Sequence, residues 1–130
     1  HKTKQSLFGI VQGGEFKDLR TKSANFISSL DFDGYGIGGV FGKSKKHMYD
    51  VIDWSIKPLD EDKPRHLIGI GVIEDIFECV ELGIDLFDCV APTRLARLGY
   101  LFITPDSKGN KTNKFRIRIT NQKYKLDKTQ

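Results

Sequence analysis

Short apolar runs alternate with longer amphipathic segments along the first 90 residues of the chain. The runs are rich in β-branched and aromatic residues, end in glycine or proline turns, and lie at residues 7–11, 32–39, 66–71 and 84–90. Between them, apolar residues recur every three or four positions, which is typical of helices that pack on one side. This alternation predicts an α/β fold whose parallel sheet is built from three strand-helix units and a final strand.

Each predicted helix has an apolar stripe that we expect to be buried. The stripes are Phe16, Leu19, Phe26, Ile27 and Leu30 in the first helix, Met48, Val51, Ile52, Ile56 and Leu59 in the second, and Ile76, Phe77 and Val80 in the third. Ser44 is a suitable N-cap for the second helix. Glu74 and Asp75 suit the first turn of the third helix, which Gly83 would end.

After Arg97 the pattern changes to that of two short strand-like segments. Residues 100–104 and 114–120 flank a turn-rich segment, and in the second of them apolar residues alternate with two arginines. This pattern predicts a β-hairpin, appended to the sheet, with one buried and one cationic face. We therefore expect βα units over residues 1–98 and a basic hairpin unit over residues 99–130.

Composition is that of one globular unit, with 38% apolar and 29% charged residues among 130. Charge is polarised: residues 105–130 carry eight basic and two acidic side chains, a net of +6, while the whole chain carries +4, so the first 104 residues sum to −2. A basic edge of this kind favours a nucleic-acid partner, and a solvated lysine-rich tail is the alternative.

The chain offers few other signals of location or cofactor. No stretch is apolar for long enough to cross a bilayer and residues 1–6 do not resemble a signal peptide, so we expect a cytoplasmic protein without membrane contact. Cys79 and Cys89 lack CxxC or histidine-spaced partners, and we expect both to be reduced and buried, with no metal site in this chain. Because the sequence does not begin with Met, we expect a piece of a longer protein.

The C-terminal ends of parallel strands meet at one edge of a sheet, where ligands bind. The residues expected there are Gln12, Gly38, Gly39, Val40, Ile68, Gly69, Asp88 and Val90. An amide, glycine backbones, an apolar surface and one carboxylate would suit a flat polar ligand, although glycines at strand ends are also ordinary turns.

Two acids compete for a functional role in the fourth strand. Asp85 follows the helix-ending Gly83 and lies near the start of the strand, where acids usually serve structure, so we favour Asp88. We expect Asp88 to lose water, which is costly for a carboxylate without a partner or a chemical role. Arg94 and Arg97 follow closely and suggest a polyanionic partner. His1, His47 and His66 have no partner at motif spacing, so we expect them to be solvated or to cap helices.

Five ordered motifs give the chain a resemblance to the tRNA-guanine transglycosylases, also called queuine tRNA-ribosyltransferases. They are LFGIVQGG at 7–14, DGYGIGG at 33–39, DKPRHLIGIG at 62–71, GIDLFDCVAPTRLARLGYLF at 83–102 and NQKYKLD at 121–127. The resemblance implies that the strands are the last four of a (β/α)8 barrel, its C-terminal half. It also implies that the hairpin begins an insertion leading to a structural zinc subdomain, whose ligands would lie beyond Gln130.

The resemblance further implies a role for each candidate residue. Asp88 would be the nucleophile that attacks the ribose C1′ of the wobble guanosine in tRNA, giving a covalent glycosyl-enzyme ester and retention at the anomeric carbon. The free deazaguanine base would be held by Gln12, Gly38, Gly39, Val40, Ile68 and Gly69. Val90 would border the ribose, and Arg94 with Arg97 would bind the RNA backbone. The family's second catalytic carboxylate lies on earlier strands.

Two departures from the family pattern concern the base. Lys43 stands near the position of a base-contacting Glu, and Ile68 replaces a common Met, so the inserted base stays open between queuine, its aminomethyl-deazaguanine precursor and an archaeal-type deazaguanine. The alternatives are a non-catalytic RNA-binding subunit, which would lack the nucleophile, and a barrel enzyme acting on a phosphorylated metabolite, which would need no basic edge. We expect the whole protein to be a homodimer or heterodimer. We expect residues 1–130 alone to be inactive, because half a barrel leaves strand edges unpaired.

Overall fold

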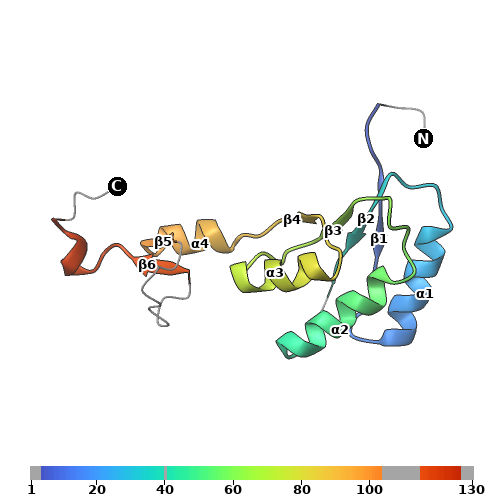
Figure 1. Ribbon diagram of the computed structural model, residues 1–130, viewed down its shortest axis with the longest axis horizontal. Coiled ribbons are helices and arrows are strands. Elements are labelled where there is room, and N and C mark those ends of the chain that lie inside the picture. The colour runs from blue at the N-terminus through green and yellow to red at the C-terminus, as the bar shows by residue number, and fades with distance from the viewer. Residues whose placement is uncertain (1–3, 40, 104–114, 127–130) are drawn as a thin grey trace. The chain divides into compact units, whose positions relative to one another are not determined.

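The structure is a computed structural model that describes residues 4–39, 41–103 and 115–126. The chain divides into two compact units, His1–Cys89 and Val90–Gln130. In the first unit the elements are, in order, β1 (Phe8–Val11), α1 (Lys17–Ser28), β2 (Gly34–Ile37), α2 (Lys45–Ile56), β3 (Arg65–Leu67), α3 (Ile73–Glu81) and β4 (Leu86–Phe87) (Figure 1). The predicted alternation of strand and helix is confirmed.

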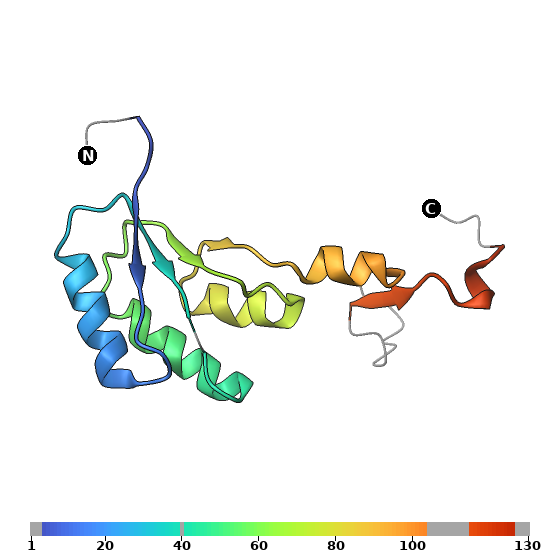
Figure 2. The ribbon, with the colours of Figure 1, turned by 180° about the vertical axis from the view of Figure 1, so that it is seen from behind.

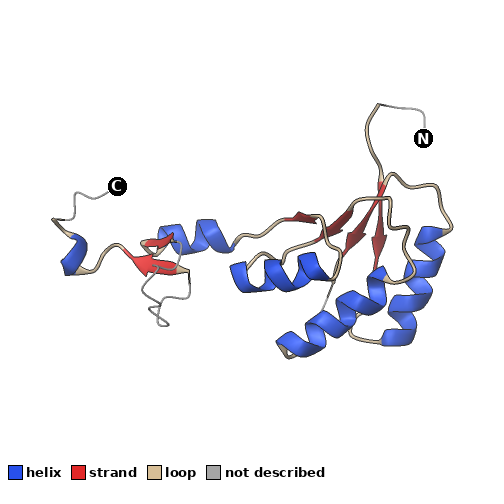
Figure 3. Ribbon diagram, viewed as in Figure 1, coloured by secondary structure: helices blue, strands red, loops and turns tan. Residues whose placement is uncertain are grey.

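The four strands form one parallel sheet in the order β1-β2-β3-β4, so each strand pairs with the next one along the chain (Figure 3). Figure 2 shows the same strands from behind. Sequential order is the arrangement of neighbouring strands in a (β/α)8 barrel, whereas a doubly wound sheet reverses its order at a switch point.

One face of this sheet forms the core of the first unit. Val11, Tyr35, Ile37 and Leu67 are 0% exposed and cluster with apolar residues of α1, α2 and α3. The second helix matches its prediction: the Ser44 side chain accepts a hydrogen bond from the His47 N–H, and the expected stripe is buried. Because side chains alternate along each strand, the other face carries a different set of residues.

The predicted stripe of α1 is wrong in detail. Leu19 and Phe26 are 48% and 64% exposed, whereas Arg20 and Ala24 are 0% exposed and Ile27 packs against the core. The apolar stripe is wider than the contact with the sheet, so only one flank of the helix is covered. Sequence periodicity located the helix but could not tell which flank of its stripe faces the strands.

The third helix and the fourth strand differ from expectation in a similar way. Phe77 of α3 is 64% exposed, and the buried positions of this helix are Asp75 and Cys79. Burial is the main cause that raises the pKa of the Cys79 thiol to about 11. In β4, Leu86 is 45% exposed rather than buried, because its side chain lies on the face of the sheet that the helices do not cover.

Asp75 links two helices of the first unit. Its Oδ1 accepts hydrogen bonds from Lys45 Nζ at 2.6 Å and from the Tyr49 hydroxyl at 2.8 Å. Both donors belong to α2, so a carboxylate expected to favour the dipole of its own helix also fixes α3 against α2. This pairing satisfies a carboxylate that is only 6% exposed.

The second unit contains α4 (Ala91–Arg97), β5 (Tyr100–Phe102), β6 (Arg116–Arg118) and the short 3-10 helix η1 (Gln122–Tyr124). The sequence predicted a proline turn where α4 lies; proline is tolerated there because the first helical residues need no N–H partner. The predicted hairpin is confirmed as an antiparallel pair, but among the described residues it forms a separate two-stranded sheet instead of joining the other four strands.

Candidate active site

Strand register aligns the candidate residues of the first unit on one face of the sheet. Ile10, Gly36, His66 and Leu86 are successive partners across the four strands. Each of these four residues is followed, two positions later in the sequence, by a candidate residue; these are Gln12, Gly38, Ile68 and Asp88. Residues two apart share a face, so these four lie in a row at the C-terminal edge, on the face opposite the apolar core.

Gly36 and Gly38, both on this face of β2, let neighbouring side chains lie over the strand. A Cβ at Gly36 would lie 2.6 Å from Ile10 Cδ1 and 3.2 Å from Ile68 Cδ1, and one at Gly38 would lie 3.1 Å from Gln12 Nε2. Ile10 and Ile68 keep 43% and 36% of their surface exposed. They give this face an accessible apolar surface on which a flat ring could lie.

Gln12 supplies the amide of the site. Its side chain is exposed and, within the described part of the chain, has no hydrogen-bond partner. A Cβ at Gly39 would lie 2.7 Å from Gln12 Oε1, and Gly39 has a φ of +96°, so glycine is required there for two reasons. The amide is therefore available to donate to and accept from a ligand beside the Gly39 backbone.

Arg20 holds the loops that follow β1 and β2. Its Nε donates to the Gly14 carbonyl and its Nη1 to the Gly38 carbonyl, both at 2.7 Å, and the guanidinium lies 5.3 Å from the centre of the Phe41 ring. Burial lowers the pKa of this fully buried side chain. Sequence reasoning missed Arg20; the available signal was its spacing of four residues from Ala24 on the covered flank of α1.

The backbone of Gly38 is engaged within the protein. Its carbonyl accepts from Arg20, and its N–H donates to the Val11 carbonyl at 3.3 Å. We expected Gly38 to contact a base through its backbone. In this structure both of its backbone groups already form hydrogen bonds within the protein. Gly39 is exposed, and Val40 lies outside the described residues.

Asp88 lies at the end of the last strand of the sheet. Its Oδ1 is 3.0 Å from the Gly69 N–H nitrogen and 3.0 Å from His66 Nε2. Gly69 has a φ of +80°, and a Cβ added there would meet no atom within 4 Å, so the turn that presents its N–H is open to solvent. The Asp88 side chain is 57% exposed, so the expected loss of water does not occur in this structure.

His66 is the second residue of the site that sequence reasoning missed. It was expected to be solvated or to cap a helix, yet its ring contacts the candidate nucleophile. The only signal in the sequence was its place two residues before Ile68, on the same face of β3. Asp85, by contrast, serves the fold as expected: its Oδ2 accepts from the Arg65 N–H at 2.8 Å, and its own N–H donates to the Arg65 carbonyl at 2.9 Å.

The remaining candidates belong to the second unit. Val90 is the N-cap of α4 and is 49% exposed, and Arg94 and Arg97 are exposed in the last turn of that helix. In the hairpin, Tyr100 pairs with Arg118 and Phe102 with Arg116, so the cationic face also carries aromatic rings.

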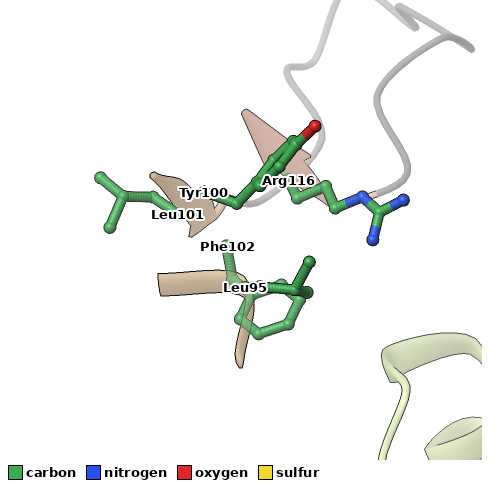
Figure 4. A pocket seen from close by; sticks show the side chains of 5 residues that line it. All are labelled: Leu95, Tyr100, Leu101, Phe102 and Arg116. Atoms are coloured by element: carbon green, nitrogen blue, oxygen red, sulfur yellow. The ribbon is translucent and has the colours of Figure 1, made fainter. Parts of the chain in front are cut away.

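The cationic face of the hairpin is therefore also a stacking surface. The guanidinium carbons of Arg116 and Arg118 lie 5.5 and 5.8 Å from the centre of the Tyr100 ring. A shallow hollow in this unit is lined by Leu95, Tyr100, Leu101, Phe102 and Arg116 (Figure 4). Arginines beside aromatic rings are a combination that binds phosphates and unpaired bases.

Comparison with known proteins shows the family to which the chain belongs. The family model described as "Queuine tRNA-ribosyltransferase" matches residues 1–130. The chain belongs to this family. A protein of Archaeoglobus fulgidus named "Putative queuine tRNA-ribosyltransferase" is 57% identical over 124 residues, which are 95% of this chain and 31% of the relative.

Bacterial members of the queuine tRNA-ribosyltransferase family are also similar. The queuine tRNA-ribosyltransferase of Acinetobacter baumannii (strain ATCC 17978) is 46% identical over 127 residues, 97% of this chain and 31% of the relative. That of Acinetobacter baylyi is 46% identical over 125 residues, 95% of this chain and 30% of the relative. The chain thus spans about a third of the length of these curated relatives.

The resemblance implies a zinc site whose ligands would lie beyond Gln130, and that site stays a prediction. Among the described residues, no group of three or more His, Cys, Asp or Glu side chains could hold a metal ion. Cys79 is buried as expected, whereas Cys89 is only partly buried, and neither forms a disulfide. No helix in the described ranges is long and apolar enough to span a membrane.

Proposed function

We propose that the whole protein exchanges guanine at the wobble position of tRNA for a 7-deazaguanine, acting in the cytoplasm, and that Asp88 is its nucleophile. The observation that carries the proposal is the position of this carboxylate. It lies at the C-terminal edge of a parallel sheet, held through one oxygen, in a row with an unpaired amide and an exposed apolar side chain. Ligands of parallel α/β sheets bind at this edge.

The reaction proceeds in two displacements at the ribose C1′. An oxygen of Asp88 forms a bond to C1′ while the C1′–N9 bond breaks, and the electron pair of that bond leaves with guanine. The incoming deazaguanine then attacks C1′ through N9 and loses its N9 proton to water, while the departed guanine takes up one proton and the Asp88 carboxylate leaves with its own electron pair. Two inversions give net retention, and a carboxylate suits the oxocarbenium-like transition state of each step.

The base would lie over Ile68 and beside Gln12. The amide of Gln12 offers a donor and an acceptor to the edge of a purine-like ring, and the Gly39 backbone lies next to that amide. Gly69 and Val40 would complete the edge contacts, whereas Gly38 supports the loop through its bond to Arg20. A base that reaches this surface must leave its stack, as in other enzymes that act on a base.

The RNA would be bound largely by cations of the second unit. Arg94 and Arg97 are exposed on α4, and Val90 at the start of that helix would border the ribose. Phosphate contacts of this kind add affinity that falls as salt concentration rises. Replacing Arg94 and Arg97 with alanine should weaken tRNA binding. It should also make the binding constant less dependent on salt concentration, by the amount that about two phosphate contacts contribute.

The order of the strands in the sheet also supports a proposal about the fold of the whole protein. We propose that β1 to β4 are the last four strands of a (β/α)8 barrel and that the hairpin of residues 99–130 begins an insertion. Support comes from the parallel, sequential strand order and from helices that cover one face of the sheet. A structural zinc in the whole protein, and its assembly into a dimer, remain expectations from the family resemblance.

Base exchange tests the proposed nucleophile directly. The full-length protein is incubated with tRNA and labelled guanine, and the Asp88→Asn variant is compared with Asp85→Asn as a matched control on the same strand. Asp88→Asn should lower the exchange rate by about a thousandfold or more, because an amide does not form the ester. Asp85→Asn should remain active. Undiminished exchange by Asp88→Asn would exclude this function for Asp88.

A further inference from the structure

His66 and Asp88 meet because of the register between β3 and β4. His66 is paired with Leu86 across these parallel strands, and Asp88 lies two residues beyond Leu86 on the same face. The imidazole Nε2 reaches Asp88 Oδ1 at 3.0 Å across 22 residues of sequence. The ring is 32% exposed, so it borders the site without being part of the apolar core.

Both donors around the carboxylate converge on the same oxygen. The Gly69 N–H and His66 Nε2 contact Oδ1, and Oδ2 has no hydrogen-bond partner among the described residues. An ionised carboxylate only accepts hydrogen bonds, so the proton between the two side chains belongs to Nε2. Two donors of fixed direction hold one oxygen and thereby set the rotation of the whole carboxylate group.

We propose that His66 is a positioning residue for Asp88: with the Gly69 N–H it holds Oδ1, so that Oδ2 is the oxygen that attacks the ribose. This role rests on the proposed function. In the covalent ester, Oδ2 is bonded to C1′ and Oδ1 becomes the carbonyl oxygen. In the second displacement the Oδ2–C1′ bond breaks and its electron pair returns to the carboxylate, whose growing negative charge is shared with Oδ1.

The two donors therefore contribute to both steps. In the first, they limit the orientations of a side chain that is otherwise 57% exposed and free to rotate. In the second, they stabilise charge that develops on Oδ1 as the ester is cleaved. Neither contribution depends on the size or the apolar surface of the imidazole, so a side chain that donates from the same place should replace it.

Three substitutions at His66 separate hydrogen bonding from packing. His66→Gln places an amide N–H near the position of Nε2, His66→Phe keeps a ring without a donor, and His66→Asn keeps a polar group that is too short to reach Asp88. His47→Gln is the matched control, because His47 lies on α2 beside Trp54 and outside the site. Each variant is made in the full-length protein and assayed for base exchange with tRNA and labelled guanine.

His66→Phe and His66→Asn should each lower kcat by about tenfold to a hundredfold, which is the usual effect of one hydrogen bond to a charged group. The KM for tRNA should stay within about twofold, because the bond orients a reacting group. His66→Gln should recover most of the loss, and His47→Gln should match the unmodified protein. If His66→Phe fails to fold, the comparison of His66→Asn with His66→Gln still tests the contribution of the hydrogen bond.

The assay includes Asp88→Asn so that the two proposals can fail separately. Full exchange by Asp88→Asn would overturn the proposed function. An inactive Asp88→Asn together with a fully active His66→Phe or His66→Asn would leave Asp88 as the nucleophile and overturn the role of His66. A His66→Gln variant as slow as His66→Asn would also overturn it, because the donor alone would then be insufficient.

Discussion

Tyr35, Ile37 and Leu67 point to the face of the sheet that the helices cover and have no exposed surface, whereas Gly36, Gly38 and Ile68 alternate with them on the opposite face. The covered face consists of large side chains packed against α1, α2 and α3. The open face consists of glycines, an amide, a histidine, a carboxylate and apolar side chains that remain partly exposed. Neighbouring residues of one strand thus contribute to different properties, stability on one face and ligand contact on the other.

The open face carries three apolar side chains that stay partly exposed in this chain. Ile10, Ile68 and Leu86 are 43%, 36% and 45% exposed and lie on three different strands or their ends. Contiguous exposed apolar surface generally marks a binding site or an interface. Because the two faces differ in this way, we expect the same type of substitution to change stability more on the covered face than on the open face.

The largest expected difference is between Leu67→Ala and Ile68→Ala, two adjacent residues of opposite orientation. Leu67→Ala should lower the free energy of unfolding by about 3 kcal/mol, because it leaves a cavity in a closed core. Ile68→Ala should cost about 1 kcal/mol or less and should instead raise the KM for the incoming base. Urea denaturation of the full-length variants measures the first effect and exchange kinetics the second. Equal losses of stability would contradict the contrast.

A smaller difference is expected between Gly9→Ala and Gly36→Ala. A Cβ at Gly9 would lie 2.5 Å from Phe32 Cδ2 and 2.6 Å from Ile27 Cγ2, both on side chains packed against the core. This substitution should cost about 1–3 kcal/mol through overpacking. At Gly36 the nearest atom is the far end of the flexible Ile10 side chain, which can change rotamer, so the cost should be smaller than at Gly9. Thermal unfolding of both variants compares the two sites.

The effect expected to be smallest near neutral pH concerns the thiol of Cys79, which packs in the core of the covered face. Burial raises its pKa from the ordinary value of 9.0 to about 11, so the folded protein keeps a proton that the unfolded chain loses. Its contribution to stability should therefore decline as the pH rises from about 9 to about 11. The slope of unfolding free energy against pH in this window should be less steep in Cys79→Ala. An identical slope in the two proteins would argue against an enclosed thiol.

A large part of this arrangement could be predicted from the sequence. Periodicity located the first three helices, Ser44 was recognised as a cap, and the parallel alternation placed Gln12, Ile68 and Asp88 at one edge. Each of these features depends on local patterns, because helix and strand periods and capping bonds involve residues close in sequence. The five motifs of the family resemblance added the chemical role proposed for Asp88.

Other features depended on how the elements pack against one another. The apolar stripe of α1 is wider than its contact, so only packing decided that Arg20 and Ala24 would be covered and Phe26 exposed. The bond between His66 and Asp88 requires a particular register between two strands, with His66 opposite Leu86. The sequence by itself determined which acid ends the fourth strand. The tertiary structure alone decided which donors reach that acid, because a hydrogen bond between separate strands depends on distances that no local pattern specifies.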